Sequence, residues 1–345
     1  MKNYLSQSPL MTLTAALLSC LTVTSCSDNS PMIDNPSIPI EEKVVVANRG
    51  AGSISFIDAK SNMLAKTLSI PNSEPMYVVY VPKTDKIYVG DRAGKKIHVI
   101  NPQSYQVEKS IDAGDGIFHM WTDGQGKELW VVNDIDNTIS VIDLSTNAIT
   151  ITIDIDAKPH DVFVTEDGLT AYVSVFTENT ASDMVYKFST STYAKTGEAS
   201  VGKEPHLYHL SSNKLFVPCQ SGQVYILDPN TMNIISEKDY VGAHGIFAAP
   251  DMNAVFVSNI SGNQLYSINS ATGEQLQNPV ESSGVTPHNI VVNSKGDKMF
   301  VTHSNISVNA VSVYNLTGEG TITPSASIQS GANPFGLSYY KREQK

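Results

Sequence analysis

The chain has 345 residues, a formal net charge of −11, and a composition of 41% hydrophobic and 17% charged residues, with 22 glycines and 17 prolines. These values describe a turn-rich globular protein of one large domain or two ordinary ones. The acidic balance argues against a general binder of nucleic acid or of anionic membranes, because phosphate groups are bound by basic clusters.

The N-terminus is typical of a secretory signal peptide over residues 1–25. Lys2 is its only charge, and its apolar run over 10–23 is too short for a membrane span. The letters VTSC, over 23–26, fit the bacterial lipobox, which implies cleavage before Cys26 and lipidation of its thiol. An ordinary secretory signal with an unrelated cysteine, or a lipobox ending at Cys20, is the alternative. Residues 26–42 then form a polar, lipidated tether.

The rest of the chain, over 43–345, is an internal repeat. Seven segments align on a shared valine, and these valines lie 40 to 44 residues apart. They are Val46, Val89, Val131, Val173, Val217, Val257 and Val301. Each unit contains four short runs of alternating polarity, which we name strands a to d in chain order. A period of this length with four strands predicts an all-β, seven-bladed β-propeller of four-stranded antiparallel blades.

Strand c of each unit ends on a short polar residue. Turn capping explains these residues better than catalysis, because Asp, Asn and Ser side chains bond nearby backbone N–H groups in tight turns. The seven positions are Asp58, Asn101, Asp143, Ser189, Asp228, Asn269 and Asn315.

The repeat also predicts how the ring closes. The first unit begins with strand b, over 43–48, and the chain ends on strand a, over 333–340. One blade therefore combines N-terminal strands b, c and d with a C-terminal innermost strand, a closure that protects the sheet edges. No room remains for a second domain.

The pattern YVxN…SVID, with Pro opening strand a and Gly ending the a–b turn, resembles the YVTN/YncE-like seven-bladed propellers. The resemblance covers about 300 residues of this chain. It implies the fold and leaves the function open, because propellers host many activities.

Histidine recurs where strand a begins, one place after the proline position. Because strand a lines the channel of a propeller, we expect these side chains to gather at one channel mouth. His119 lies one place later in its unit, and a one-residue bulge would bring it into the same ring. The predicted site residues are Met76, Phe118, His119, His160, His206, His244, His288 and Phe335. The alternative is that Pro-His is inherited by duplication, with each ring bonding a neighbouring backbone.

Two kinds of ligand suit such a mouth. Neutral imidazoles bind metals, so His160, His206, His244 and His288 are the candidate metal ligands. A mixture of His, Phe and Met also offers stacking faces and polar edges to a large, partly flat organic molecule. The neighbouring b–c and d–a segments carry further candidates: Arg49, Arg92, Asn133, Asn259, Asn289, His303, Tyr77, Tyr208 and Trp121.

A lipidated seven-bladed propeller with an acidic residue, Asp28, in its tether resembles the BtuG-like proteins of Bacteroidota. This resemblance implies capture of cobalamin at the cell surface and its transfer to a TonB-dependent outer-membrane transporter. It also implies a lipid anchor in the outer membrane, with the periplasmic face as the alternative location. The His rings would then contact the corrin face or its amide fringe.

Enzyme motifs are not found, so we predict a protein without catalytic activity. The sequence has no G-x-S-x-G elbow, H-E-x-x-H motif, P-loop or dinucleotide fingerprint. A lyase-type propeller using His244 or His288 as a general base is one alternative. A protein–protein scaffold is the other. Cys219 remains as a single unpaired cysteine, best explained as a buried strand residue.

Overall fold

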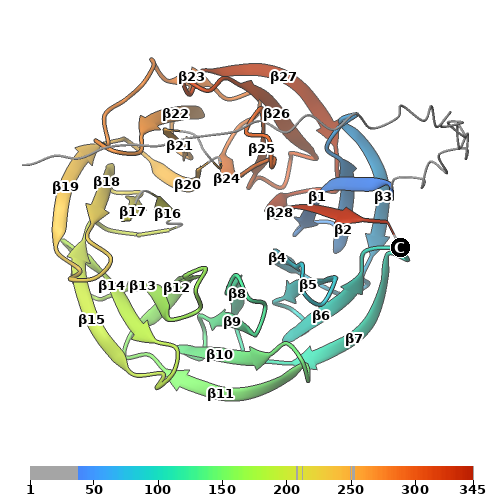
Figure 1. The fold of residues 1–345 in the computed structure, drawn as a ribbon, viewed down its shortest axis with the longest axis horizontal. Coiled ribbons are helices and arrows are strands. Elements are labelled where there is room, and N and C mark those ends of the chain that lie inside the picture. Colours follow the sequence, from blue (N-terminus) through green and yellow to red (C-terminus); the bar gives the residue numbers. More distant parts are fainter. Residues whose placement is uncertain (1–37, 207–208, 212, 249, 251–252, 345) are drawn as a thin grey trace, which may run out of the picture. The chain divides into compact units, whose positions relative to one another are not determined.

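The computed structural model describes residues 38–206, 209–211, 213–248, 250 and 253–344. These residues form seven four-stranded antiparallel sheets arranged around a central axis (Figure 1). The predicted seven-bladed β-propeller is therefore confirmed. The predicted signal peptide, Cys26 and most of the predicted tether lie outside the described residues. Over the described ranges, no helix is long and apolar enough to span a membrane.

The blades are numbered here from the one that contains both ends of the described chain, and the strands of each follow from the innermost outward. Blade 1 consists of β28 (Pro334–Glu343), β1 (Ile40–Asn48), β2 (Ser53–Asp58) and β3 (Met63–Ser69); blade 2 of β4 (Pro75–Val81), β5 (Lys86–Asp91), β6 (Lys96–Asn101) and β7 (Gln106–Asp112). Blade 3 consists of β8 (Ile117–Thr122), β9 (Glu128–Asn133), β10 (Thr138–Asp143) and β11 (Ala148–Asp154); blade 4 of β12 (Lys158–Val164), β13 (Thr170–Phe176), β14 (Asp183–Ser189) and β15 (Lys195–Val201); blade 5 of β16 (His209–Ser211), β17 (Lys214–Cys219), β18 (Gln223–Leu227) and β19 (Ile234–Asp239). Blade 6 consists of β20 (Ala243–Ala248), β21 (Ala254–Asn259), β22 (Gln264–Asn269) and β23 (Val280–Glu281); blade 7 of β24 (Pro287–Val292), β25 (Lys298–His303), β26 (Ala310–Leu316) and β27 (Ile322–Gln329).

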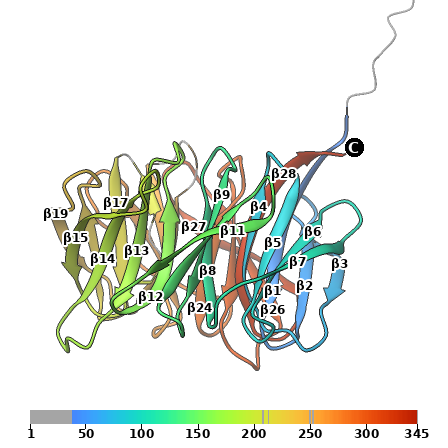
Figure 2. The same ribbon diagram turned by 90° about the horizontal axis from the view of Figure 1, so that it is seen from below.

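The core lies between neighbouring blades. The strands run between the two faces of the ring (Figure 2). Each blade therefore packs one side of its sheet against the preceding blade and the other side against the following blade. The repeat-defining valines sit on the second strand of each blade, and all are 0% exposed. The outermost strands, such as β3 and β7, are largely exposed because no further strand covers them.

The turns between the third and fourth strands carry the predicted caps. Asp143 Oδ1 accepts hydrogen bonds from the backbone N–H groups of Ser145 and Thr146, at 2.8 and 2.9 Å. Equivalent backbone bonds form at Asp58, Asn101, Asp228 and Asn269, and the Ser189 hydroxyl contacts that of Ser191. Asn315 departs from the pattern because β26 continues to Leu316, and Thr317 accepts the turn bond instead, from the Thr321 N–H.

Closure of the ring follows the predicted scheme. The C-terminal β28 pairs antiparallel with the N-terminal β1. Strand β1 begins at Ile40, whereas the sequence analysis began it at Lys43. The longer pairing buries an ionic cluster in which Arg342 lies 3.3 Å from Glu41 and 2.9 Å from Asp85. Burial alone would raise the pKa of Glu41, but hydrogen bonds from Lys43 and other partners lower it.

Cys219 ends β17, and its side chain is buried and free. Burial raises the pKa of this thiol well above its usual range. The thiol is therefore protonated at neutral pH and shielded from solvent, as the sequence predicted for a buried strand cysteine.

Candidate functional site

A bulge at the start of the innermost strand positions the candidate site. In blade 4, the pairing with the second strand moves from Pro159 to Val162, so His160 and Asp161 together face Ser174. The same register shift occurs between Pro75 and Val78, Ile117 and Met120, Ala243 and Ile246, and Pro287 and Ile290. Each of these blades therefore places two consecutive residues opposite one residue of the second strand, and in blade 6 the second of the two is Gly245.

Hydroxyl groups on the second strand hold the bulges. Ser174 Oγ accepts the Asp161 N–H at 2.9 Å in blade 4. In blade 6, Ser258 Oγ accepts the Gly245 N–H at 2.8 Å and donates to the carbonyl oxygen of His288, in the next blade, at 2.7 Å. These bonds satisfy the backbone groups that the bulge leaves unpaired and link the blades around the axis.

The first residue of each bulge belongs to one ring around the axis, which we call the histidine tier. Its aromatic members lie side by side, with ring-centroid distances of 4.3 Å for Phe118–His160 and 4.0 Å for His206–His244. The remaining neighbours are His160–His206 at 4.6 Å, His244–His288 at 4.4 Å, His288–Phe335 at 4.1 Å and Phe118–Phe335 at 5.8 Å. Met76, which aligns with them, is fully buried. The histidines of four consecutive blades therefore lie side by side, as the sequence predicted.

The histidine tier is closed. Its side chains are between 0 and 9% exposed, and other residues cover it. The Arg49 guanidinium lies 5.2 Å from the centre of the Phe335 ring, the Phe176 ring stacks on His160 at 4.4 Å, and Gln220 contacts His206. Among the described residues the tier thus forms a packed layer, where the sequence analysis expected an open cup.

Burial also sets the charge of the tier. It lowers the pKa of His288 to about 3. Burial, followed by repulsion from the neighbouring histidines, lowers the pKa of His206 and His244 well below the usual range. These imidazoles are neutral at pH 7, so each keeps one nitrogen lone pair for a ligand or a hydrogen bond.

His119 does not join the histidine tier. The bulge lies at the same place in blade 3 as elsewhere, so Phe118 occupies the tier and His119 lies one level along the axis. There its ring is 4.4 Å from the Tyr77 ring, and its Nδ1 accepts the Val162 N–H at 3.2 Å. Burial lowers the pKa of His119 to about 4.

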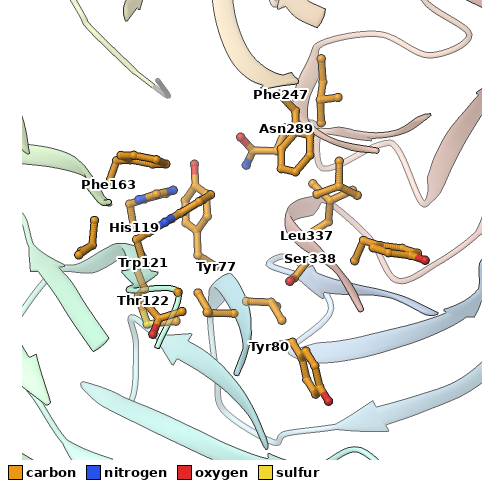
Figure 3. A pocket seen from close by; sticks show the side chains of 18 of the residues that line it. Tyr77, Tyr80, His119, Trp121, Thr122, Phe163, Phe247, Asn289, Leu337 and Ser338 are labelled. Atoms are coloured by element: carbon orange, nitrogen blue, oxygen red, sulfur yellow. The ribbon is translucent and has the colours of Figure 1, made fainter. Parts of the chain in front are cut away.

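A cavity of about 630 Å³, the axial pocket, lies beyond this second level. Figure 3 shows Tyr77, His119 and Asn289 among its lining residues. Its lining also includes Tyr80, Trp121, Phe163, Phe247, Leu337, Ser338 and Tyr339. The exposed turn residues Pro82, Gly124 and Glu166 reach its far end. The pocket therefore opens on the face of the a–b turns, opposite the face that the sequence predicted.

Unpartnered polar atoms gather where the tier meets the second level. Both carboxylate oxygens of Asp161 are buried and have no hydrogen-bond partner. The same is true of the Nδ1 atoms of His160, His206 and His244. Sequence reasoning missed Asp161. The signal was present, since Asp161 directly follows His160 and the bulge turns both residues out of the sheet.

One group of described residues has the composition of a metal site. Donor atoms of His160, Asp161 and His206 all lie within 4.8 Å of one another. Of the four predicted histidine ligands, His244 and His288 fall outside this group and stack farther round the tier.

The other candidates divide between structure and pocket. Asn133 and Asn259 bond within their own blades, to Ser140 and Tyr266. Arg92 pairs with Asp134 at 2.8 Å. The remaining ones are His303, which bonds Val285 and Ser312; Tyr77, Trp121 and Asn289, which line the axial pocket; and Tyr208, which lies outside the described residues.

No protein-family profile and no curated protein sequence matches the chain. Solved structures similar to it include Kuenenia stuttgartiensis hydrazine synthase, with a TM-score of 0.66 and 13% identity over 81% of this chain and 98% of that one. The dihydro-heme d1 dehydrogenase NirN in complex with DHE is similar with a TM-score of 0.60 and 12% identity, over 86% of this chain and 74% of that one. At this identity the similarity shows the propeller fold alone.

Proposed function

We propose that the chain is a non-catalytic binding protein that captures an organic ligand in the axial pocket, and that this ligand is a corrinoid. The observation that carries the proposal is the pocket itself, which joins aromatic walls to the polar groups of Tyr77, His119 and Asn289. Apolar walls with a few converging polar groups are typical of small-molecule sites. Aromatic rings such as Trp121 offer stacking faces to a flat macrocycle.

The geometry changes which residues would bind. A whole corrinoid is larger than a cavity of about 630 Å³. The pocket would hold one part of the molecule, and the remainder would lie on the face of the a–b turns. The closed histidine tier then supports the floor of the pocket, and His119 is the predicted histidine that reaches the ligand.

The cell-envelope part of the proposal rests on the N-terminal sequence. Lipidation of Cys26 would anchor the propeller in the outer membrane, exposed at the surface, for transfer of the ligand to a TonB-dependent transporter. Mass spectrometry of the N-terminal peptide tests the lipid, and protease treatment of intact cells tests the exposure. An unmodified Cys26 in the mature protein would contradict the anchor and leave the pocket proposal standing.

Titration of the full chain with cyanocobalamin tests the ligand. The informative variant is Ser338→Trp, which places a large ring in the axial pocket without removing a core side chain. Its matched control is Ser327→Trp, on the exposed outermost strand β27. We expect stoichiometric binding by the parent and the control, and at least about tenfold weaker binding by Ser338→Trp, because the ring occupies the ligand volume.

Each contrary result has a definite meaning. Absence of binding by the folded parent would exclude a corrinoid as the ligand. Equal binding by all three proteins would move the site away from the axial pocket.

A scaffold is the second candidate function, favoured by the exposed apolar residues Ile135, Val241, Val285 and Ile306 in the loops of the tier face. Co-purification of an envelope protein in place of corrinoid binding would select it.

A further inference from the structure

The carboxylate of Asp161 occupies an unusual position near the propeller axis. Its side chain is 2% exposed, and neither oxygen receives a hydrogen bond. His160 Nδ1 lies 3.3 Å from Oδ1, and Tyr77 and His119 are also near enough to interact electrostatically with this carboxylate. An ionised carboxylate that is removed from water needs a cation or several donors to offset its lost hydration.

The two neighbouring imidazoles have the chemistry of metal ligands. Nδ1 of His160 and Nδ1 of His206 are both buried without a hydrogen-bond donor or acceptor. A tetrahedral zinc ion lies about 2.0–2.2 Å from each donor, so its ligands are about 3.4 Å apart. The 3.3 Å separation of His160 and Asp161 matches this spacing. The donor atom of His206 lies within 4.8 Å of the other two, and binding of an ion would draw it closer.

Gln220 supplies the outer support that a ligating histidine needs. The structure places the nitrogen of its side-chain amide against Nε2 of His206, and a half-turn about the terminal bond exchanges that nitrogen for the amide oxygen. With the amide oxygen turned toward the ring, Gln220 accepts the Nε2 proton, and the Nδ1 lone pair is left free for a metal. The Phe176 ring, stacked on His160 at 4.4 Å, restrains the orientation of that imidazole.

From this geometry we infer that His160, Asp161 and His206 form a binding site for a first-row divalent metal ion. Two imidazoles and one carboxylate are donors that zinc, cobalt and iron accept. Three protein ligands leave a coordination position for water or another small donor. The inference is independent of the corrinoid proposal, because the site uses residues outside the lining of the axial pocket.

Metal titration of the full chain tests the site. The protein is treated with a chelator, dialysed and titrated with Zn²⁺ by calorimetry and with Co²⁺ by visible absorption. The variants are Asp161→Asn and His206→Asn, and the control is His288→Asn in the same tier, outside the group. Thermal unfolding by circular dichroism is measured for every protein with and without Zn²⁺, so that folding and binding are separated.

We expect one Zn²⁺ per chain, an intense Co²⁺ absorption band, and a melting temperature that rises with Zn²⁺. Affinity should fall at least about tenfold in Asp161→Asn and His206→Asn and remain at the parent level in His288→Asn. Without metal, Asp161→Asn should melt no lower than the parent, because the substitution removes an unpaired buried charge.

Two results would overturn the inference. One is a folded parent that takes up neither Zn²⁺ nor Co²⁺ and shows no stabilisation. The other is metal uptake that Asp161→Asn and His206→Asn leave unchanged. A metal-free Asp161→Asn that melts well below the parent, together with absent uptake, would instead identify an ion pair between Asp161 and a protonated His160.

Discussion

Gly245 lies where two neighbouring blades approach each other closely. A Cβ atom placed on it would lie 1.9 Å from the carbonyl oxygen of His288 in the next blade. In blade 1 the pairing of β28 with β1 also shifts, between Pro334 and Leu337, and Gly336 in this bulge would meet the carbonyl oxygen of Met76 at 2.4 Å. These glycines are therefore required by the approach of neighbouring innermost strands, and their backbone angles are ordinary.

The substitution Gly245→Ala should destabilise the protein by about 2 kcal/mol, because backbone atoms on both sides must move apart. Urea unfolding measures the change. Gly318→Ala is the control, since a Cβ there has nothing within 4 Å. Equal stability of the two variants would show that the strands separate without cost.

We expect His303 to make the free energy of unfolding depend on pH. Nδ1–H donates to the Val285 carbonyl at 3.1 Å, and Nε2 accepts from the Ser312 hydroxyl at 2.7 Å, an arrangement that requires the neutral ring. Burial lowers its pKa from 6.5 to about 4. The unfolded chain therefore binds a proton between these values that the folded chain does not.

This contribution to stability is complete above pH 6.5 and is lost as the pH falls toward about 4. The loss is on the order of 3 kcal/mol. We predict that His303→Gln, which does not titrate, removes this part of the pH dependence. The measurement is the difference between parent and variant unfolding free energies across that window. A difference that stays constant with pH would contradict the assigned role of His303.

At the scale of elements, the turns between the third and fourth strands use the same capping hydrogen bonds in most blades, and blade 7 differs. Most of these turns rest on a carboxylate or amide that binds two backbone N–H groups, as Asp143 does. In blade 7, β26 is longer, and the turn N–H is bound by the Thr317 hydroxyl, not by the Asn315 side chain. The same alignment position therefore binds the turn backbone in blade 3, whereas in blade 7 Thr317 accepts the turn bond.

We predict that Asp143→Ala lowers the melting temperature by about 2 °C, through loss of the turn bonds, while Asn315→Ala leaves it unchanged. Differential scanning calorimetry of the two variants beside the parent is the measurement. A larger loss from Asn315→Ala than from Asp143→Ala would reverse this assignment.

At the scale of the whole molecule, stability depends on joining the two ends of the described chain. Strand β28 supplies the innermost strand of blade 1, and Arg342 adds a buried ionic contact to β1 and to the turn after β4. The side chains of Arg342 and Glu41 are 4% and 6% exposed. Without Arg342, Glu41 keeps Lys43 as its cation and Asp85 keeps the Tyr80 hydroxyl, but the guanidinium that joins the two carboxylates is lost.

Arg342→Met should therefore cost about 3 kcal/mol, because it leaves Glu41 and Asp85 without their shared cation. Lys341→Met, at the exposed neighbouring position, is the control. Chemical unfolding followed by circular dichroism compares them. Similar curves for the two variants would show that closure rests on strand pairing and apolar packing alone.

Much of this architecture was predictable because it is repeated. A period near 42 residues, a buried valine on each second strand and a chain that ends on an unmatched innermost strand specify seven blades and their closure. The alignment of His160, His206, His244 and His288 on one level followed from the same repetition. Each of these features depends on contacts that a blade makes in the same way every time.

Only the tertiary structure decided what the axis is like. The sequence did not reveal that the histidine tier is closed, that the axial pocket opens on the opposite face, or that Asp161 joins His160 and His206. Those features depend on how closely seven innermost strands approach one another and on bulges that turn two consecutive residues out of the sheet. A repeat pattern shows which residue occupies each position along a blade. The distance between side chains across the axis depends on how all the blades pack together.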